Sequence, residues 1–260
     1  MNETRRRLFP EERWERIAAL VEQNGRVSVD ELSTLFDVSK VTIRGDLDEL
    51  ERRGILSRTH GGAVAVDADK AELTFKYRER VNIDEKSRIG EAAAVLVSHG
   101  DAIALDASTT ALQVAKRIKD RHELTVVTNG IYIALELEDA PDVTVVMPGG
   151  ILRRGSASLV GKLGEEVLTK FNIQKGFFGA KGVTLSEGLT DVNTFEVQLK
   201  RAMVHAAKQV IGIADHTKWG RVAFASFASL DQLDMIITDV EAPEDMVAAI
   251  RERGIEVRLV

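Results

Sequence analysis

Small polar residues follow the ends of several short apolar segments in the second part of the sequence. After residues 102–105 comes Asp106 and then three hydroxyl side chains in a row, Ser108, Thr109 and Thr110. Hydroxyls and the free amides at a helix start bind phosphate, so this loop predicts a phosphate site. Other polar residues at such ends are Thr128, Asn129, Gly149, Gly150, Lys181, Asp215 and Lys218.

These residue types fit a polyol phosphate. Amides and hydroxyls would bind the phosphate, Asn129 and Asp215 would bind sugar hydroxyls, and Lys218 would supply a counter-charge. Each feature also has a structural explanation: Ser-Thr-Thr often caps a helix, Gly149-Gly150 can form a turn, and Lys218 can be a surface lysine. Their joint occurrence at successive strand ends favours a ligand site.

The segments that must position these residues alternate between strand-like and helical patterns. The β-prone runs cover residues 102–105, 124–128, 143–147, 176–179, 210–214, 235–238 and 255–260. Such alternation is typical of a layered α/β domain with a largely parallel sheet, in which ligands bind at the carboxyl ends of the strands. We place this domain at residues 83–260, after a charged linker at 65–82 in which Leu73, Phe75 and Tyr77 are candidates for docking onto it.

Residues 1–64 predict a smaller, mainly helical domain. Apolar residues at three- and four-residue spacing indicate a helix over residues 11–24, and Gly25 follows as a stop signal. The sequence from Ser28 to Glu31 is a capping box for a second helix that reaches residue 36. Ser39 can cap a third helix over residues 40–53. The side chains expected to be buried by the last two helices are Leu32, Leu35, Val41 or Ile43, Leu47 and Leu50, and Gly54 is expected to end the third.

Two short helices joined by a tight turn, with another helix packed across them, form a helix-turn-helix whose last helix enters the major groove of DNA. The alternating residues 55–64, with a turn at Gly61-Gly62, predict a β-hairpin wing. A three-helix module for protein interaction is the alternative interpretation. The residues expected at DNA are Ser28, Ser39, Lys40, Thr42, Arg44, Arg58 and His60.

The charge and composition narrow the class of protein. The formal net charge is −6, and residues 1–62 hold 11 Lys and Arg against 12 Asp and Glu, so a DNA-binding face requires segregation of charge. There is no cysteine and the five histidines are scattered, so we expect neither a metal site nor a cofactor. No segment has the length and apolarity of a membrane span, so we expect a cytoplasmic protein without a membrane partner.

The amino-terminal residues resemble a known family of regulators. The stretch from Val38 to Leu50, followed by Arg58-Thr59-His60-Gly61-Gly62-Ala63, resembles the DNA-binding signature of the DeoR family of sugar-metabolism repressors. Members of that family usually carry two consecutive basic residues where this chain has Arg44 and Gly45. By that resemblance Gly45 is expected to lack a DNA contact that the family makes, and a glycine inside a helix costs about 1 kcal/mol relative to alanine.

The resemblance continues through the second domain. It is carried by Asp106 to Thr110, Val127-Thr128-Asn129, Pro148-Gly149-Gly150, Leu159-Val160-Gly161, Phe178 to Gly182, Glu196, Lys200 to Met203 and Asp215 to Gly220, which are similar to the effector domain of DeoR-type repressors. That domain is related in fold to ribose-5-phosphate isomerase. The resemblance implies that the Ser108–Thr110 loop and Lys218 hold a phosphate and that Glu196 contacts the sugar.

The sequence therefore predicts a transcriptional repressor of carbohydrate-metabolism genes rather than an enzyme. Its expected partners are double-stranded operator DNA, a phosphorylated sugar effector and further copies of itself in a homodimer or homotetramer. The alternative is a sugar-phosphate isomerase-like enzyme. Isomerisation needs a carboxylate base, but the strand end that supplies Asp-Gly-Ala-Asp in those isomerases reads Phe178-Gly179-Ala180-Lys181 here. A purely structural role would leave the polar strand ends unexplained.

Overall fold

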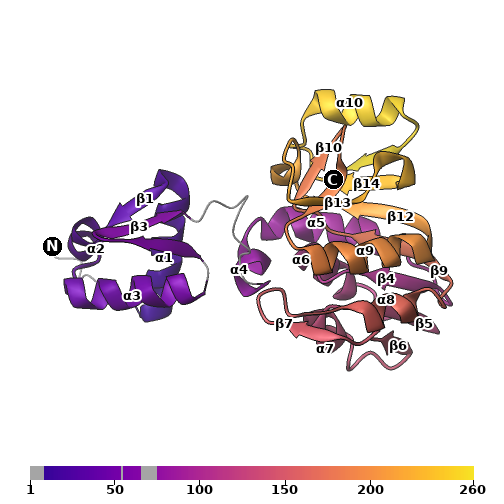
Figure 1. Cartoon of the computed structure of the whole chain (residues 1–260), viewed down its shortest axis with the longest axis horizontal. Helices are drawn as coiled ribbons and strands as arrows, with labels where there is room; N and C mark the ends of the chain where they lie inside the picture. The colour runs from indigo at the N-terminus through magenta and orange to yellow at the C-terminus, as the bar shows by residue number, and fades with distance from the viewer. Residues whose placement is uncertain (1–8, 54, 66–74) are drawn as a thin grey trace. The chain divides into compact units, whose positions relative to one another are not determined.

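The computed structural model describes residues 9–53, 55–65 and 75–260. The chain divides into two compact units, Met1–Tyr77 and Arg78–Val260 (Figure 1). The prediction of a helix-turn-helix followed by a layered α/β domain is confirmed. Among the described residues, no helix is both long enough and apolar enough to cross a bilayer.

Between residues 9 and 65, the described part of the first unit forms three helices and a three-stranded antiparallel sheet. The helices are α1 (Pro10–Asn24), α2 (Val29–Phe36) and α3 (Lys40–Arg52), and the strands β1 (Arg26–Ser28), β2 (Leu56–Thr59) and β3 (Gly62–Ala65) lie in the order β1-β3-β2. Left-handed residues end the first two helices, Gly25 at φ 72° and Asp37 at φ 52°. Ile17, Leu32, Ile43, Leu47 and Leu50 form the buried core of this unit.

Two expectations for this unit are corrected. Leu35 is 62% exposed, because α2 is only two turns long and turns its buried face, with Val29 and Leu32, towards the core. The hairpin turn falls at His60-Gly61, and Gly62 belongs to β3 instead. Gly62 lies so close to β1 that a Cβ there would collide with the carbonyl oxygen of Val27. The sequence did not predict β1. Gly54 lies outside the described residues.

The second unit is built on seven parallel strands. They are β4 (Ala102–Leu105), β5 (Leu124–Thr128), β6 (Val143–Val146), β9 (Ile173–Phe178), β12 (Ala207–Ile213), β14 (Met235–Thr238) and β15 (Glu256–Leu259), in the order β15-β14-β12-β9-β4-β5-β6. Every neighbouring pair is parallel. All seven predicted β-prone runs lie on these strands. After β4 the chain adds β5 and β6 on one side of it, and after β9 it adds β12, β14 and β15 on the other side. The direction of strand addition therefore reverses between β4 and β9.

Helices connect and cover this sheet. They are α5 (Ile83–Ala94), α6 (Thr109–Ala115), α7 (Ile131–Glu136), α8 (Lys162–Leu168), α9 (Thr194–Ala206) and α10 (Glu244–Glu252), and α4 (Phe75–Arg80) precedes them at the boundary between the two units. Because parallel crossovers are right-handed, α6 and α7 cover one face of the sheet and α9 and α10 the other. Helix α5 packs on α6. Helix α4 occupies part of the predicted linker, with Phe75 buried, whereas Leu73 lies outside the described residues.

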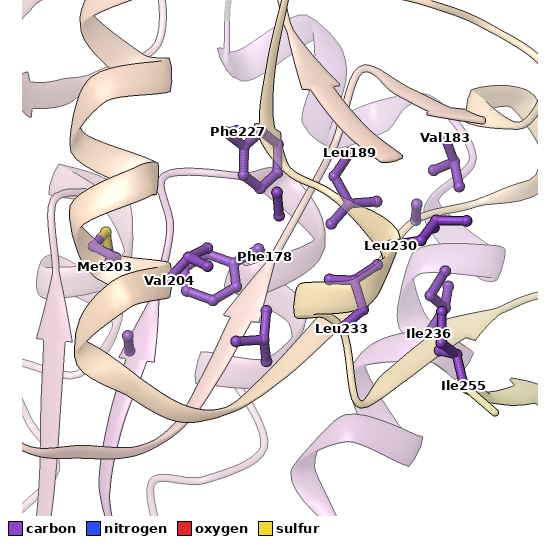
Figure 2. Packing of buried hydrophobic residues seen from close by; sticks show 14 of the residues in the cluster. Phe178, Val183, Leu189, Met203, Val204, Phe227, Leu230, Leu233, Ile236 and Ile255 are labelled. Carbon is purple, nitrogen blue, oxygen red and sulfur yellow. The ribbon is translucent and has the colours of Figure 1, made fainter. Parts of the chain in front are cut away.

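Short antiparallel strands that the sequence did not predict complete the unit. They are β7 (Ile151–Arg153) with β8 (Ser158–Val160), and β10 (Gly182–Thr184), β11 (Gly188–Asp191) and β13 (Ala225–Ala228). Figure 2 shows Phe178 of β9 among Met203 and Val204 of α9 and Phe227 of β13. This core fixes α9 and the small sheet over the carboxyl end of β9.

Candidate functional site

The polar residues predicted from the sequence gather at the carboxyl ends of the central strands. In the sheet register Leu105 of β4 lies between Thr128 of β5 and Phe177 of β9. Asp106 therefore lies between the ends of β5 and β9, and the amide of Gly179 donates to its Oδ2 atom at 3.1 Å. This contact spans the point where the strand order reverses, which is where open α/β sheets bind ligands.

A buried charge network crosses this point. The Nζ atom of Lys200, on α9, lies 2.8 Å from Asp106 Oδ2 and 2.7 Å from Asp191 Oδ2, and it donates to the carbonyl of Gly179 at 2.8 Å. Burial by itself lowers the pKa of Lys200, but the two carboxylates raise it above its ordinary value, so the lysine is charged. The network joins α9 and β11 to the ends of β4 and β9.

Glu196 is held by a second network one helical turn before Lys200. Its Oε1 atom accepts from Arg153 Nη1 at 2.8 Å, from Ser156 Oγ at 2.9 Å and from the Ser158 hydroxyl. Its Oε2 atom accepts from Asn129 Nδ2 at 3.3 Å. The structure thus brings Glu196 to the predicted site residue Asn129 and ties both to the β7–β8 hairpin.

Asp215 and Lys218 lie together after β12. The Oδ1 atom of Asp215 accepts from Asn82 Nδ2 at 3.0 Å, from the amide of Thr217 at 3.1 Å and from the Thr217 hydroxyl. Its Oδ2 atom lies 3.9 Å from Lys218 Nζ. Burial raises the pKa of Asp215, but Lys218 and these hydrogen bonds outweigh burial and hold it below its ordinary value.

Positive charge concentrates around Lys181. Burial lowers the pKa of this lysine well below its ordinary value, and the nearby cations Arg78, Lys218 and Lys200 lower it further, while Asp191 opposes them. An anion placed among these groups would relieve their mutual repulsion. The arrangement therefore favours binding of a negatively charged ligand.

The hydroxyl loop lies beside the same strand ends. Thr109 and Thr110 are buried, and Ser108 caps α6 by accepting from the amide of Ala111 at 3.1 Å. Gly179 approaches Ser108 so closely that a Cβ on Gly179 would collide with the serine side chain. The loop after β4 and the loop after β9 are thus in contact.

Two other predicted residue sets have local structural roles. The hydroxyl of Thr128 accepts from the amide of Gly130 at 3.0 Å. Gly149 and Gly150 have φ values of 85° and 128°, and Gly150 lies against the carbonyl of Val160. Their assignment to the ligand site stays a prediction.

Three acceptor atoms at these strand ends are buried without a hydrogen bond to any residue that the structure describes. They are Asp106 Oδ1, Asn129 Oδ1 and Asp215 Oδ2. Leaving a buried acceptor unpaired costs about 1 to 3 kcal/mol, and each could accept from a ligand hydroxyl. Together with the cations around Lys181, these acceptors fit a molecule that combines an anionic group with several hydroxyls.

A possible metal cluster nearby is explained by the fold. His216, Asp239 and Glu241 offer ligand atoms that lie within 4.8 Å of one another. However, Asp239 already accepts from the amide of His216 at 2.7 Å, from its ring Nδ1 at 2.8 Å and from the amide of Glu241 at 3.1 Å. We assign these residues to closing the turn after β14.

In the first unit, α3 presents an exposed amino-terminal turn. Ser39 caps it by accepting from the amide of Thr42 at 3.0 Å, and Lys40 pairs with Asp30 of α2 at 2.9 Å. Thr42 and Arg44 are exposed. The four predicted residues of this turn thus share one accessible helix end.

The other predicted DNA contacts differ in accessibility. His60 is exposed in the hairpin turn. Arg58 lies partly against α3, with its Nε atom 3.2 Å from Asp48. Ser28 caps α2, because its hydroxyl accepts from the amide of Glu31 at 3.1 Å.

Sequence reasoning missed several residues that line the candidate site. Asp191, Arg153, Ser156, Ser158, Asn82, Lys86 and Arg78 were not predicted there, and Lys200 was noted only as part of a motif. Most come from segments without regular periodicity. A charged residue on the inner face of a helix, as at Lys200, was the one local signal available.

Comparisons with known proteins cover both units. Residues 13–69 match the family described as DeoR-like helix-turn-helix domain, and residues 81–240 match the DeoR C terminal sensor domain. The chain is 38% identical over 252 residues to the HTH-type transcriptional regulator GolR of Listeria innocua, covering 97% of this chain and 99% of that protein. It is 30% identical over 243 residues to the glycerol-3-phosphate regulon repressor of Escherichia coli, covering 94% and 96% respectively. Ribose 5-phosphate isomerase A from Methanocaldococcus jannaschii is a structural neighbour at 16% identity and TM-score 0.40, covering 53% of this chain and 55% of that one.

Proposed function

The chain belongs to the DeoR family of helix-turn-helix transcriptional regulators, and from that premise we propose that it represses carbohydrate-metabolism genes in response to a phosphorylated sugar. The amino-terminal turn of α3 and the β2–β3 wing bind operator DNA. The carboxyl ends of β4, β5, β9 and β12 bind the sugar phosphate.

The ligand assignment rests on one observation. Cations and buried acceptors that lack a hydrogen bond to the described residues occur together at the same strand ends. Lys218 supplies positive charge for a phosphate, a bound phosphate would favour the charged form of Lys181, and the Ser108–Thr110 loop supplies hydroxyls and amides. Asp106, Asn129 and Asp215 supply acceptors for the sugar hydroxyls. An unphosphorylated sugar would bring no negative charge to these cations, whereas inorganic phosphate would bring no sugar hydroxyls to the acceptors.

The same contacts support a sensor rather than an isomerase. A general base needs a carboxylate that can take a proton from the substrate. Lys200 forms an ion pair with Asp106. Glu196 accepts hydrogen bonds from Arg153 and from two serines. Glu196 is therefore engaged at both of its oxygens, because Asn129 donates to Oε2, and Asp106 is engaged at Oδ2.

Regulation follows from linkage between the two binding events. If the sugar phosphate binds better to one arrangement of the protein and DNA to another, each ligand weakens the other by the same factor. A coupling of about 1 to 3 kcal/mol changes operator affinity about 5 to 150-fold. A single winged helix covers few base pairs, so we further propose that a homodimer or homotetramer reads repeated half-sites.

Titration calorimetry tests the ligand assignment. Glycerol 3-phosphate, ribose 5-phosphate and glucose 6-phosphate are each compared with the unphosphorylated parent, using the wild type, Lys218→Ala and a control, Lys170→Ala, at an exposed lysine of the same unit. We expect one phosphate ester to bind, its parent not to bind, and only Lys218→Ala to lose binding. Full binding by Lys218→Ala would remove Lys218 from the site, and turnover of a phosphate ester would favour the isomerase.

A further inference from the structure

We infer that Asn82 is a positioning residue of the sugar-phosphate site, and that it links Asp215 to the segment through which the chain leaves the sensor unit towards the DNA-binding unit. This inference rests on the proposed function and assigns the regulation of that site. It concerns contacts within Arg78–Val260 alone.

The conformation of Asn82 is unusual for a residue at a helix start. It occupies the N-cap position of α5 with φ 50° and ψ 46°, in the left-handed region, and its side chain makes no capping hydrogen bond. Asparagine is favoured at N-caps because its side chain normally accepts from the first-turn amides. Here Nδ2 instead donates across the unit to Asp215 Oδ1 at 3.0 Å and to Thr217 Oγ1 at 3.4 Å.

This contact determines which oxygen of Asp215 is available. Asn82 and Thr217 together saturate Oδ1. The Oδ2 atom remains buried, without a hydrogen bond to the described residues, and faces Lys218 at 3.9 Å. Asn82 therefore holds the carboxylate in the rotation that offers Oδ2 to a sugar hydroxyl beside the phosphate-binding lysine.

The same residue belongs to a tightly fastened chain segment. Lys86, one turn into α5, is 4% exposed and donates its Nζ hydrogens to the carbonyls of Arg78 at 2.6 Å and of Val81. These bonds tie the end of α4 to α5 on both sides of Asn82. Residues 78–86 are thus joined to the site by Asn82 and lie between that site and the DNA-binding unit along the chain. We therefore expect a ligand that binds Asp215 to change how firmly residues 78–86 are fixed to the sensor unit.

Two substitutions separate positioning from helix capping. Asn82→Gly removes the amide but retains the left-handed conformation, which glycine adopts freely. Asn82→Asp keeps the shape and improves a helix cap, since a carboxylate is favoured there, but it places a negative charge against Asp215. Glu123→Gly is the matched control, because Glu123 is also left-handed (φ 54°) and is exposed.

Amide hydrogen exchange of the full chain without ligand is the first arm of the test. Positioning predicts that both Asn82 variants speed exchange in the 215–219 turn as well as in 78–86, and that Glu123→Gly changes neither segment. A change confined to the first turn of α5, or no change in Asn82→Asp, would overturn the inference.

Binding of inorganic phosphate, glycerol 3-phosphate, ribose 5-phosphate and glucose 6-phosphate is the second arm. We expect Asn82→Gly to weaken the active ester about tenfold, as for loss of one hydrogen bond to a charged group, and Asn82→Asp to weaken it more. Equal binding by wild type and Asn82→Asp would overturn the inference. If no ester binds the wild type, the proposed function fails for these ligands, and the exchange arm still decides the role of Asn82.

Discussion

The Nζ atom of Lys200 lies 2.8 Å from Oδ2 of Asp106, and this ion pair is buried at the point where the strand order of the sheet reverses. Asp191 shares the same ammonium group at 2.7 Å. One cation thus compensates two buried carboxylates. The proposed ligand site depends on this balance, because Gly179 and its loop are held by Asp106 and Lys200.

Replacing Lys200 by methionine should strongly destabilise the sensor unit. Methionine keeps much of the side-chain volume but leaves Asp106 and Asp191 buried without a counter-charge, and breaking a buried pair in this way costs about 3 to 5 kcal/mol. Urea unfolding followed by circular dichroism measures the loss. Lys208→Met, at an exposed lysine on β12, is the control and should change the free energy of unfolding by less than about 0.5 kcal/mol. Equal stability of the two variants would contradict the role assigned to Lys200.

The ion pair between Lys200 and Asp106 could not be predicted from the sequence, whereas several strands could. Strands β4, β5 and β14 were predicted to the residue, since each is a short apolar run before a polar turn. Lys200 and Asp106 are far apart in the sequence and meet only because α9 packs over β9. Neither periodicity nor spacing encodes that contact. Asn82 escaped prediction for the same reason.

The errors in the first unit also have physical causes. Leu35 satisfies the spacing of an amphipathic helix, but α2 ends one residue later and the described residues leave that side chain 62% exposed. Strand β1 is three residues long, and only its pairing with β3 defines it. The choice between Val41 and Ile43 required the tertiary structure, which leaves Val41 75% exposed and Ile43 fully buried.

Arg44→Ala should weaken operator binding without unfolding the first unit, because Arg44 is exposed on α3. If it contacts a phosphate, the slope of log affinity against log salt should fall by about 1. Fluorescence anisotropy at several salt concentrations measures both quantities. Arg52→Ala is the comparison, since Arg52 lies at the opposite end of α3 and pairs with Glu49 at 2.6 Å. Unchanged affinity in Arg44→Ala at physiological salt would contradict the placement of Arg44 at the DNA.

Gly45 offers a gain-of-function test on the same helix. Nothing lies within 4 Å of a Cβ built there, so Gly45→Ala should stabilise the first unit by up to about 1 kcal/mol through helix propensity. Gly45→Arg should in addition raise DNA affinity and steepen the salt dependence. Thermal unfolding and anisotropy separate the two effects. A Gly45→Arg protein with the DNA affinity of Gly45→Ala would show that this position does not approach DNA.

Lys86 should make stability depend on pH in the alkaline range. Burial lowers its pKa from 10.5 to about 8; Asp215 opposes the shift, and Lys218 and Arg78 add to it. The unfolded chain therefore binds more protons between pH 8 and 10.5, so the contribution of Lys86 to stability rises with pH across that window. The free energy of unfolding of the wild type relative to Lys86→Met should increase by about 2 kcal/mol from pH 7 to 9.5. A difference that stays constant with pH would show that Lys86 has an ordinary pKa.

We propose that sugar-phosphate binding and operator binding are coupled in this protein. The most direct test of this coupling is the anisotropy of labelled DNA from upstream of this gene, titrated with the full chain at fixed salt. The titrations are made with and without glycerol 3-phosphate, ribose 5-phosphate and glucose 6-phosphate and their unphosphorylated parents. We predict specific binding that one phosphate ester shifts about 5 to 150-fold, with no shift from its parent. Binding no tighter than to random DNA, or specific binding that none of these esters changes, would contradict the account.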